Sequence, residues 1–123
     1  MMRQFLNITR ALSDEGRVRL LLALRGGEQC VCRLIDLLGL SPSTVSKHIS
    51  ILEQAELIEC RKDGRWHYYR LPAAETAPEP VRATLQWLDS MVGSSPIAKS
   101  DRARLKALAR EAKEKISACC YRK

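Results

Sequence analysis

At 123 residues the chain is long enough for one hydrophobic core but too short for two domains of ordinary size. Its hydrophobic fraction of 46% excludes an intrinsically disordered chain. The formal net charge of +7 suggests a polyanionic partner, with nucleic acid ahead of a membrane surface. Nothing at the N-terminus resembles a signal peptide, and the longest apolar run, residues 20–24, is too short to span a bilayer. We therefore expect a cytoplasmic protein with no membrane partner.

The positive charge is unevenly distributed along the chain. Residues 99–123 carry nine Lys/Arg against three Asp/Glu, a net of +6, whereas residues 41–71 carry five against four, a net of +1. Binding of nucleic acid through residues 41–71 would therefore depend on where the few basic side chains lie. The chain also has five cysteines, which in a reducing compartment are better interpreted as thiols or ligands than as a disulfide framework.

The first third of the chain predicts three helices. Residues 3–12 place apolar side chains at helical spacing and predict a short amphipathic helix. We expect Ser13 to cap a second helix, which is apolar on nearly every side and ends at Gly26. A third helix is predicted over residues 31–38, because apolar residues recur there at positions i, i+3, i+4 and i+7.

The next segment predicts a helix-turn-helix. Gly39 closes the third helix, Ser41 caps a fourth, and Pro42 occupies the first helical position, where proline is favoured. The face opposite the apolar stripe of the fourth helix carries small polar and basic side chains, which allow close approach to a DNA groove and can bind bases or phosphates. A solvent-exposed face that is merely rich in serine is the simpler alternative. The side chains expected to contact DNA are Ser43, Thr44, Ser46, Lys47 and Ser50.

A basic β-hairpin is predicted directly after this helix. Two strand-like segments, residues 57–62 and 65–71, flank Asp63-Gly64, a dipeptide that favours a type I′ turn because both central residues need positive φ. Basic side chains at the tip could reach phosphates or a narrow minor groove. We expect this contact from Arg61, Lys62 and Arg65. The predicted fold is mainly α with a β-hairpin, a winged helix-turn-helix.

Two further helices are predicted, over residues 81–92 and from Ser100 onward. Helices at the two ends of so small a chain find little partner surface within it, so we expect them to form a homodimer, which would match a palindromic DNA operator. We expect residues 1–95 to form the DNA-binding and dimerisation domain. Residues 96–123 would form a basic helix and a cysteine-bearing tail.

These segments together resemble the ArsR/SmtB family of bacterial metalloregulatory repressors. The resemblance covers roughly residues 5–95 and implies a dimeric repressor, not an enzyme, that leaves its operator when an effector binds. The motifs that carry it are residues 12–20, 28–34, 41–52 and 61–71. One departure is Pro42, where many members have a polar residue that can touch DNA.

The Cys30-Val31-Cys32 motif resembles the arsenic-sensing branch of that family. This resemblance implies trivalent arsenic or antimony as the effector and no permanently bound cofactor. The best-known pattern of that branch has a third cysteine three residues later, where this chain has Ile35.

The chemistry of these thiols agrees with such an effector, because soft thiolates select thiophilic ions, and trivalent arsenic prefers three sulfurs. On a helix Cys30 and Cys32 would point about 200° apart and flank the core stripe, so binding one ion would unwind the first turn of the third helix. Because that helix positions the recognition helix, ligation would change DNA affinity. The simpler alternative is that Cys30 and Cys32 are two buried small hydrophobic residues.

The third sulfur ligand could come from Cys119 or Cys120, from Cys60, or from an exogenous thiol. Cys119 and Cys120 are favoured, because adjacent cysteines near a C-terminus can swing.

Other functions are compatible with parts of the sequence. A repressor of the same fold could sense oxidants or persulfide through Cys30 or Cys32 paired with Cys119 or Cys120. A thiol enzyme such as a reductase is disfavoured, because the chain has Cys-x-Cys rather than Cys-x-x-Cys and no Gly-rich phosphate loop. A nonspecific architectural DNA-binding protein is a further alternative. Zinc on residues 81–92 is disfavoured, because that segment has no His and only one Asp.

Overall fold

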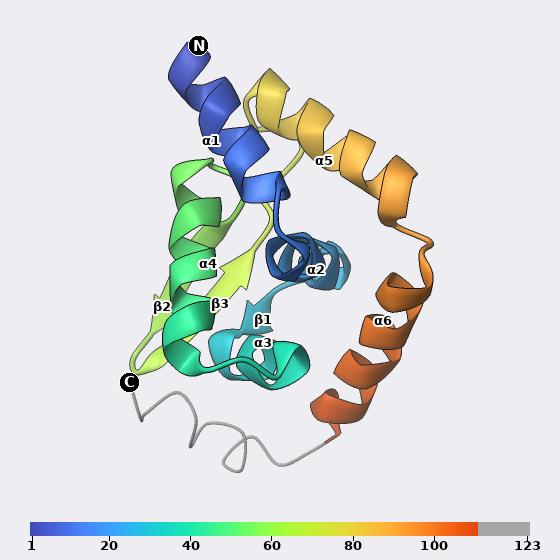
Figure 1. The fold of residues 1–123 in the computed structure, drawn as a ribbon. Helices are drawn as coiled ribbons and strands as arrows, with labels where there is room; N and C mark the ends of the chain where they lie inside the picture. The colour runs from blue at the N-terminus through green and yellow to red at the C-terminus, as the bar shows by residue number, and fades with distance from the viewer. Residues whose placement is uncertain (111–123) are drawn as a thin grey trace.

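The computed structural model describes residues 1–110, a mainly helical unit with one small antiparallel sheet (Figure 1). No helix in that part of the chain has the length and apolar character needed to cross a bilayer. The elements in chain order are α1 (Met2–Leu12), α2 (Glu15–Ala23), the 3-10 helix η1 (Leu24–Gly26), β1 (Gln29–Cys30), α3 (Val31–Leu38), α4 (Pro42–Gln54), β2 (Glu59–Asp63), β3 (Trp66–Arg70), α5 (Glu79–Val92) and α6 (Pro96–Ala109).

The junction of α1 and α2 differs from the prediction in its cap. Asp14, not Ser13, caps α2, because its Oδ2 accepts hydrogen bonds from the backbone N–H groups of Gly16 (2.8 Å) and Arg17 (3.3 Å). Ser13 belongs to the end of α1, where its hydroxyl donates to the Arg10 carbonyl at 2.8 Å. A carboxylate is the better acceptor at this position, since the N-terminus of a helix carries partial positive charge.

The helix-turn-helix agrees with the prediction. Helix α3 spans Val31–Leu38 and ends at Gly39, whose φ of 68° is the left-handed conformation that glycine adopts without strain. Ser41 caps α4, accepting a hydrogen bond from Thr44 N at 3.2 Å, and Pro42 takes the first helical position. One face of α4 enters the core through Val45, Ile49 and Leu52, which fixes the opposite face toward solvent.

The sheet has the strand order β1-β3-β2, so the predicted hairpin gains a third strand. Strand β1 pairs antiparallel with β3, with Gln29 opposite Tyr69 and Cys30 opposite Tyr68. Two residues are too few to show the alternation by which strands are predicted, and this strand was therefore missed. It ties the segment before α3 to the hairpin.

The hairpin turn also differs from the prediction. Asp63 pairs with Trp66, so Gly64 and Arg65 are the central turn residues. Only Gly64 has positive φ, at 63°. A single positive φ at the first central position is the pattern of a type II′ turn rather than of the predicted type I′ turn.

The last described helix starts earlier than predicted. Helix α6 begins at Pro96, where the Ser95 hydroxyl accepts from Ala98 N at 3.3 Å, rather than at Ser100. It packs against α2 and α3, as Figure 1 shows at its lower right. Asp101, nearly buried, accepts two hydrogen bonds from Arg19 of α2, at 2.8 and 3.0 Å, and the hydrogen bond with Asp101 raises the pKa of Arg19.

Candidate nucleic-acid interface and cysteine site

The outer face of α4 presents the predicted set of side chains to solvent. Its members are all exposed, namely Ser43, Thr44, Ser46, Lys47 and Ser50. At the start of the helix, the Ser41 hydroxyl lies 2.9 Å from Thr44 Oγ1 and 3.2 Å from Ser43 Oγ, so these hydroxyls are mutually oriented. Hydroxyls of this kind can donate to phosphates or to base edges, and their small size leaves room for DNA.

A buried arginine positions α4 from the opposite side. Arg17 of α2 donates to the backbone carbonyls of Ala11 (3.1 Å) and Arg10 (3.0 Å), and its Nη1 lies 3.0 Å from Nδ1 of His48. Since a guanidinium only donates, His48 accepts at Nδ1 and carries its proton on Nε2, which lies 3.6 Å from Asp14 Oδ2. His48 therefore packs inward from α4, and the whole network joins α1, α2 and α4.

No motif in the sequence predicts this network. Arg17 and His48 are 31 positions apart, and an arginine on a helix is usually solvent-exposed. The one feature of the sequence that indicates a buried Arg17 is that this arginine interrupts the apolar positions of α2. Within α2, Arg17 is buried together with four apolar residues.

The three basic side chains of the wing do not have equivalent surroundings. All three are exposed, but Arg61 is held by Glu28, with hydrogen bonds of 2.9 and 2.7 Å, and its guanidinium lies 4.6 Å from the centre of the Tyr68 ring. The hydrogen bond from Arg61 lowers the pKa of Glu28, and the same bond raises the pKa of Arg61. Arg61 is thus attached to the segment before β1, whereas Lys62 and Arg65 lie next to or within the turn.

Cys30 and Cys32 lie in the core, which corrects the expectation that they flank it. Cys30 is 4% exposed and Cys32 is 0% exposed. Cys30 is also not helical: it ends β1 and caps α3 with extended backbone angles, φ −68° and ψ 142°. The 200° separation expected for two helical residues therefore does not apply. Pairing of β1 with β3 draws Cys30 inward, an effect that helical periodicity cannot reveal.

Cys60 lies on the other side of the sheet from Cys30. It is half-buried on β2 opposite Tyr69, whereas Cys30 is opposite Tyr68. Directly paired residues share a face and consecutive residues alternate, so the two thiols point to opposite faces. Burial raises the pKa of Tyr69, which agrees with the position of its ring among the core side chains.

Within residues 1–110 no group of three His, Cys, Asp or Glu side chains is arranged to hold a metal ion. The two remaining predicted ligands, Cys119 and Cys120, lie outside the described residues. The structure therefore brings Cys30 and Cys32 into one buried segment and separates them from Cys60.

The recognition helix, the preceding α3 and the basic hairpin define a winged helix-turn-helix of the DNA-binding class. Solved structures of that class have the same fold. HlyU from Vibrio cholerae N16961 aligns with a TM-score of 0.61 and 25% identity, covering 74% of this chain and 94% of that chain. NolR from Sinorhizobium fredii aligns with a TM-score of 0.60 and 26% identity, over 75% and 87% of the two chains.

Sequence comparison identifies the family. Residues 14–59 match the family described as "Bacterial regulatory protein, arsR family". The chain is 34% identical over 89 residues to the arsenic resistance transcriptional regulator ArsR2 of Pseudomonas putida, covering 67% of this chain and 77% of the relative. It is 38% identical over 86 residues to ArsR1 of the same organism, covering 69% of this chain but 60% of that relative's length. The chain therefore belongs to the ArsR family of bacterial regulatory proteins.

Proposed function

We propose that this regulator is a homodimeric repressor of arsenical resistance genes, and that it leaves a palindromic operator when trivalent arsenic or antimony is bound by cysteine thiolates. The relatives at 34–38% identity include regulators named for arsenic resistance, and an arsenical resistance operon repressor of Staphylococcus aureus is 38% identical over 69 residues. Cys30 and Cys32 would be two of the ligands. Their soft sulfur donors suit a thiophilic trivalent ion better than a hard cation.

The observation that carries this proposal is the position of Cys30 at the junction of β1 and α3. Its backbone pairs with Tyr68 in the hairpin, and the same residue caps the helix that precedes the recognition helix. A displacement of Cys30 would therefore move both proposed DNA-binding elements. It would act on the wing through β3, and on α4 through α3. This gives the effector two routes for changing DNA affinity.

Glu28 strengthens the connection to the wing. It lies two residues before Cys30, and its two hydrogen bonds to Arg61 attach the cysteine segment to β2 as well as to β3. Movement of residues 28–32 would therefore change the position or freedom of a basic wing side chain. We propose that Arg61 acts in DNA binding in this coupled way, while Lys62 and Arg65 contact phosphates from the tip.

The burial of Cys30 and Cys32 means that ion binding has to open the segment. Neither sulfur can reach solvent in the described state, since the two cysteines are 4% and 0% exposed. Opening the first turn of α3 would expose them, and thiolate ligation would hold that turn open. An effector can shift the equilibrium between a closed and an open first turn of α3 only if it binds one of these states more tightly. Here the ion would bind the open state more tightly.

The third thiolate is proposed to come from Cys119 or Cys120. Cys60 is disfavoured because it lies on the opposite sheet face from Cys30. An exogenous thiol is the alternative source. A zinc site on α5 is disfavoured as well, because its two carboxylates, Glu79 and Asp89, pair with Arg82 and Arg25 and the helix has no His or Cys.

The test is a DNA-binding titration on the promoter upstream of the gene, followed by fluorescence anisotropy with and without arsenite or antimonite. Release of the wild type should appear as a loss of affinity on the order of 10–100-fold, the usual range of allosteric coupling. Cys30→Ser and Cys32→Ser should remain bound. Cys60→Ser is the matched control and should be released like the wild type. Since a hydroxyl is costly at a buried site, alanine variants at positions 30 and 32 should repeat the result.

A Cys119→Ser/Cys120→Ser double variant locates the third ligand. Retention of that variant on DNA assigns the ligand to the pair, and release assigns it to another thiol. If the wild type is not released by arsenite or antimonite but is released by an oxidant or persulfide, the arsenic proposal is wrong and the redox-sensing repressor replaces it.

A further inference from the structure

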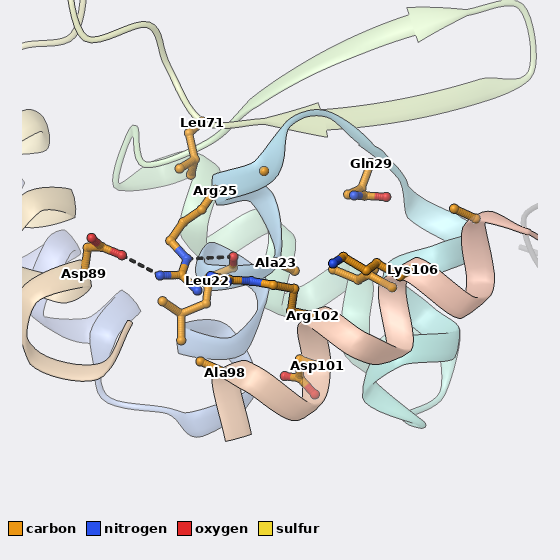
Figure 2. Close-up of a pocket in the computed structure, with 13 residues that line it drawn as sticks. Leu22, Ala23, Arg25, Gln29, Leu71, Asp89, Ala98, Asp101, Arg102 and Lys106 are labelled. Atoms are coloured by element: carbon orange, nitrogen blue, oxygen red, sulfur yellow. Dashed lines mark hydrogen bonds and ion pairs between the residues drawn. The ribbon is translucent and has the colours of Figure 1, made fainter. Parts of the chain in front are cut away.

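We propose that a cavity between α2, β1 and α6 is a second ligand site, and that it binds a small organic anion with an apolar body. The cavity has a volume of about 730 Å³, within the range of about 300–1,000 Å³ that is usual for small-molecule sites. Figure 2 shows α6 along one wall and the end of α2 along the other. Neither Cys30 nor Cys32 lines it.

The inner part of the cavity is apolar. Leu22 and Ala23 come from the end of α2, Ala98 and Leu105 come from α6, and Leu71 follows the hairpin. These side chains could cover the hydrocarbon part of a ligand, and a predominantly apolar lining with few polar groups is typical of such sites.

Both carboxylates in the lining are already neutralised. Asp89 accepts a hydrogen bond from Arg25 at 2.5 Å, and Arg25 also donates to the Leu22 carbonyl at 3.2 Å. Asp101 accepts two hydrogen bonds from Arg19 of α2. Neither acidic group is therefore available to neutralise a further cation in the cavity.

Two cations of the lining remain uncompensated within the part of the chain that the structure describes. Arg102 and Lys106 are four residues apart on α6 and therefore lie on the same face of it. Figure 2 shows both extending from α6 toward the end of α2, with Gln29 on the opposite side of the space. Among residues 1–110, neither has a hydrogen-bond or ion-pair partner. Two uncompensated positive charges over an apolar cavity match an anionic headgroup joined to an apolar body.

The test uses a matched pair of fluorescent probes. 8-Anilinonaphthalene-1-sulfonate has the anionic group and the apolar rings, and N-phenyl-1-naphthylamine has the rings without the charge. Both are titrated into the full-length wild type and into an Arg102→Gln/Lys106→Gln variant. Loss of the charge-assisted contacts should weaken the sulfonate about tenfold, with the neutral probe changed by less than about twofold. Lys99→Gln, which removes an exposed cation from the same helix, should leave both affinities unchanged.

Two other results would overturn the proposal. Equal affinity of the sulfonate for the wild type and the double variant would show that Arg102 and Lys106 hold no anion there. A double variant that leaves the sulfonate unchanged but lowers the salt dependence of DNA binding would make these side chains phosphate contacts instead. Thermal unfolding of each variant, followed by circular dichroism, verifies that the exposed substitutions leave the fold intact.

Discussion

At the scale of single residues, Arg17 supports the proposed DNA-binding face of α4 without being part of it. It is 9% exposed, and it connects the end of α1 to His48 on the inner side of the recognition helix. A buried guanidinium is tolerated here because each of its three nitrogens has an acceptor. The orientation of α4 thus depends on a polar network as well as on its apolar face.

We predict that Arg17→Ala lowers the free energy of unfolding by about 2–3 kcal/mol, because it leaves the acceptors at Ala11 and His48 without a donor, whereas the Arg10 carbonyl keeps the Ser13 hydroxyl. DNA affinity should fall with it, since the position of α4 is less well fixed. Urea denaturation and the promoter titration measure the two effects. Arg3→Ala is the control, an exposed arginine on α1. A loss of stability no larger than that of the control would contradict this role for Arg17.

At the scale of elements, the position of the hairpin turn determines which basic side chains lie at the tip of the wing. Pairing of Asp63 with Trp66 puts Arg65 in the turn itself and Lys62 one residue before the strand end. Arg61 is one residue further back and bonded to Glu28. The tip therefore projects two basic groups, while the third connects the wing to the rest of the molecule.

We predict that Lys62→Ala and Arg65→Ala each reduce the slope of log affinity against log salt by about one, because each removes one phosphate contact. The loss of affinity should be similar for specific and unrelated DNA sequences, since phosphates carry no sequence information. Arg70→Ala is the control: Arg70 lies at the other end of β3 and pairs with Glu59 at 3.2 Å. Titrations at several salt concentrations provide the slopes. An unchanged slope for both tip variants would place the DNA elsewhere.

At the scale of the whole molecule, α1 and α5 leave large apolar side chains uncovered. Phe5 and Leu6 are 62% and 55% exposed, and Trp87 and Met91 are 59% and 67% exposed. Figure 1 shows α1 and α5 along the upper side of the molecule, away from α3 and the tip of the hairpin. Exposed apolar groups in such number are typical of an interaction surface, and their separation from the hairpin tip suits a dimer whose two wings remain free for DNA.

We predict that Phe5→Ser/Trp87→Ser shifts the protein from dimer to monomer, because both substitutions place hydroxyls on the proposed interface. Sedimentation velocity at several concentrations measures the change, and affinity for a two-half-site operator should fall with it. Leu40→Ser removes an apolar side chain that is 40% exposed in the turn before α4, and it should leave the dimer unchanged. Dimers that persist in the double variant would mean that another surface associates.

Local signals were sufficient for the helix-turn-helix, and tertiary contacts decided the rest. Gly39, Ser41 and Pro42 determine where α3 ends and α4 begins, because a left-handed residue, a cap and a fixed φ act within a few residues. The burial of Cys30 and Cys32 follows instead from pairing with a strand 38 residues away, as Cys30 opposite Tyr68 shows. The Arg17–His48 contact and the cavity beside α6 likewise join segments distant in sequence. Periodicity and capping are short-range properties, so they predict elements, whereas the environment of a side chain depends on which elements pack together.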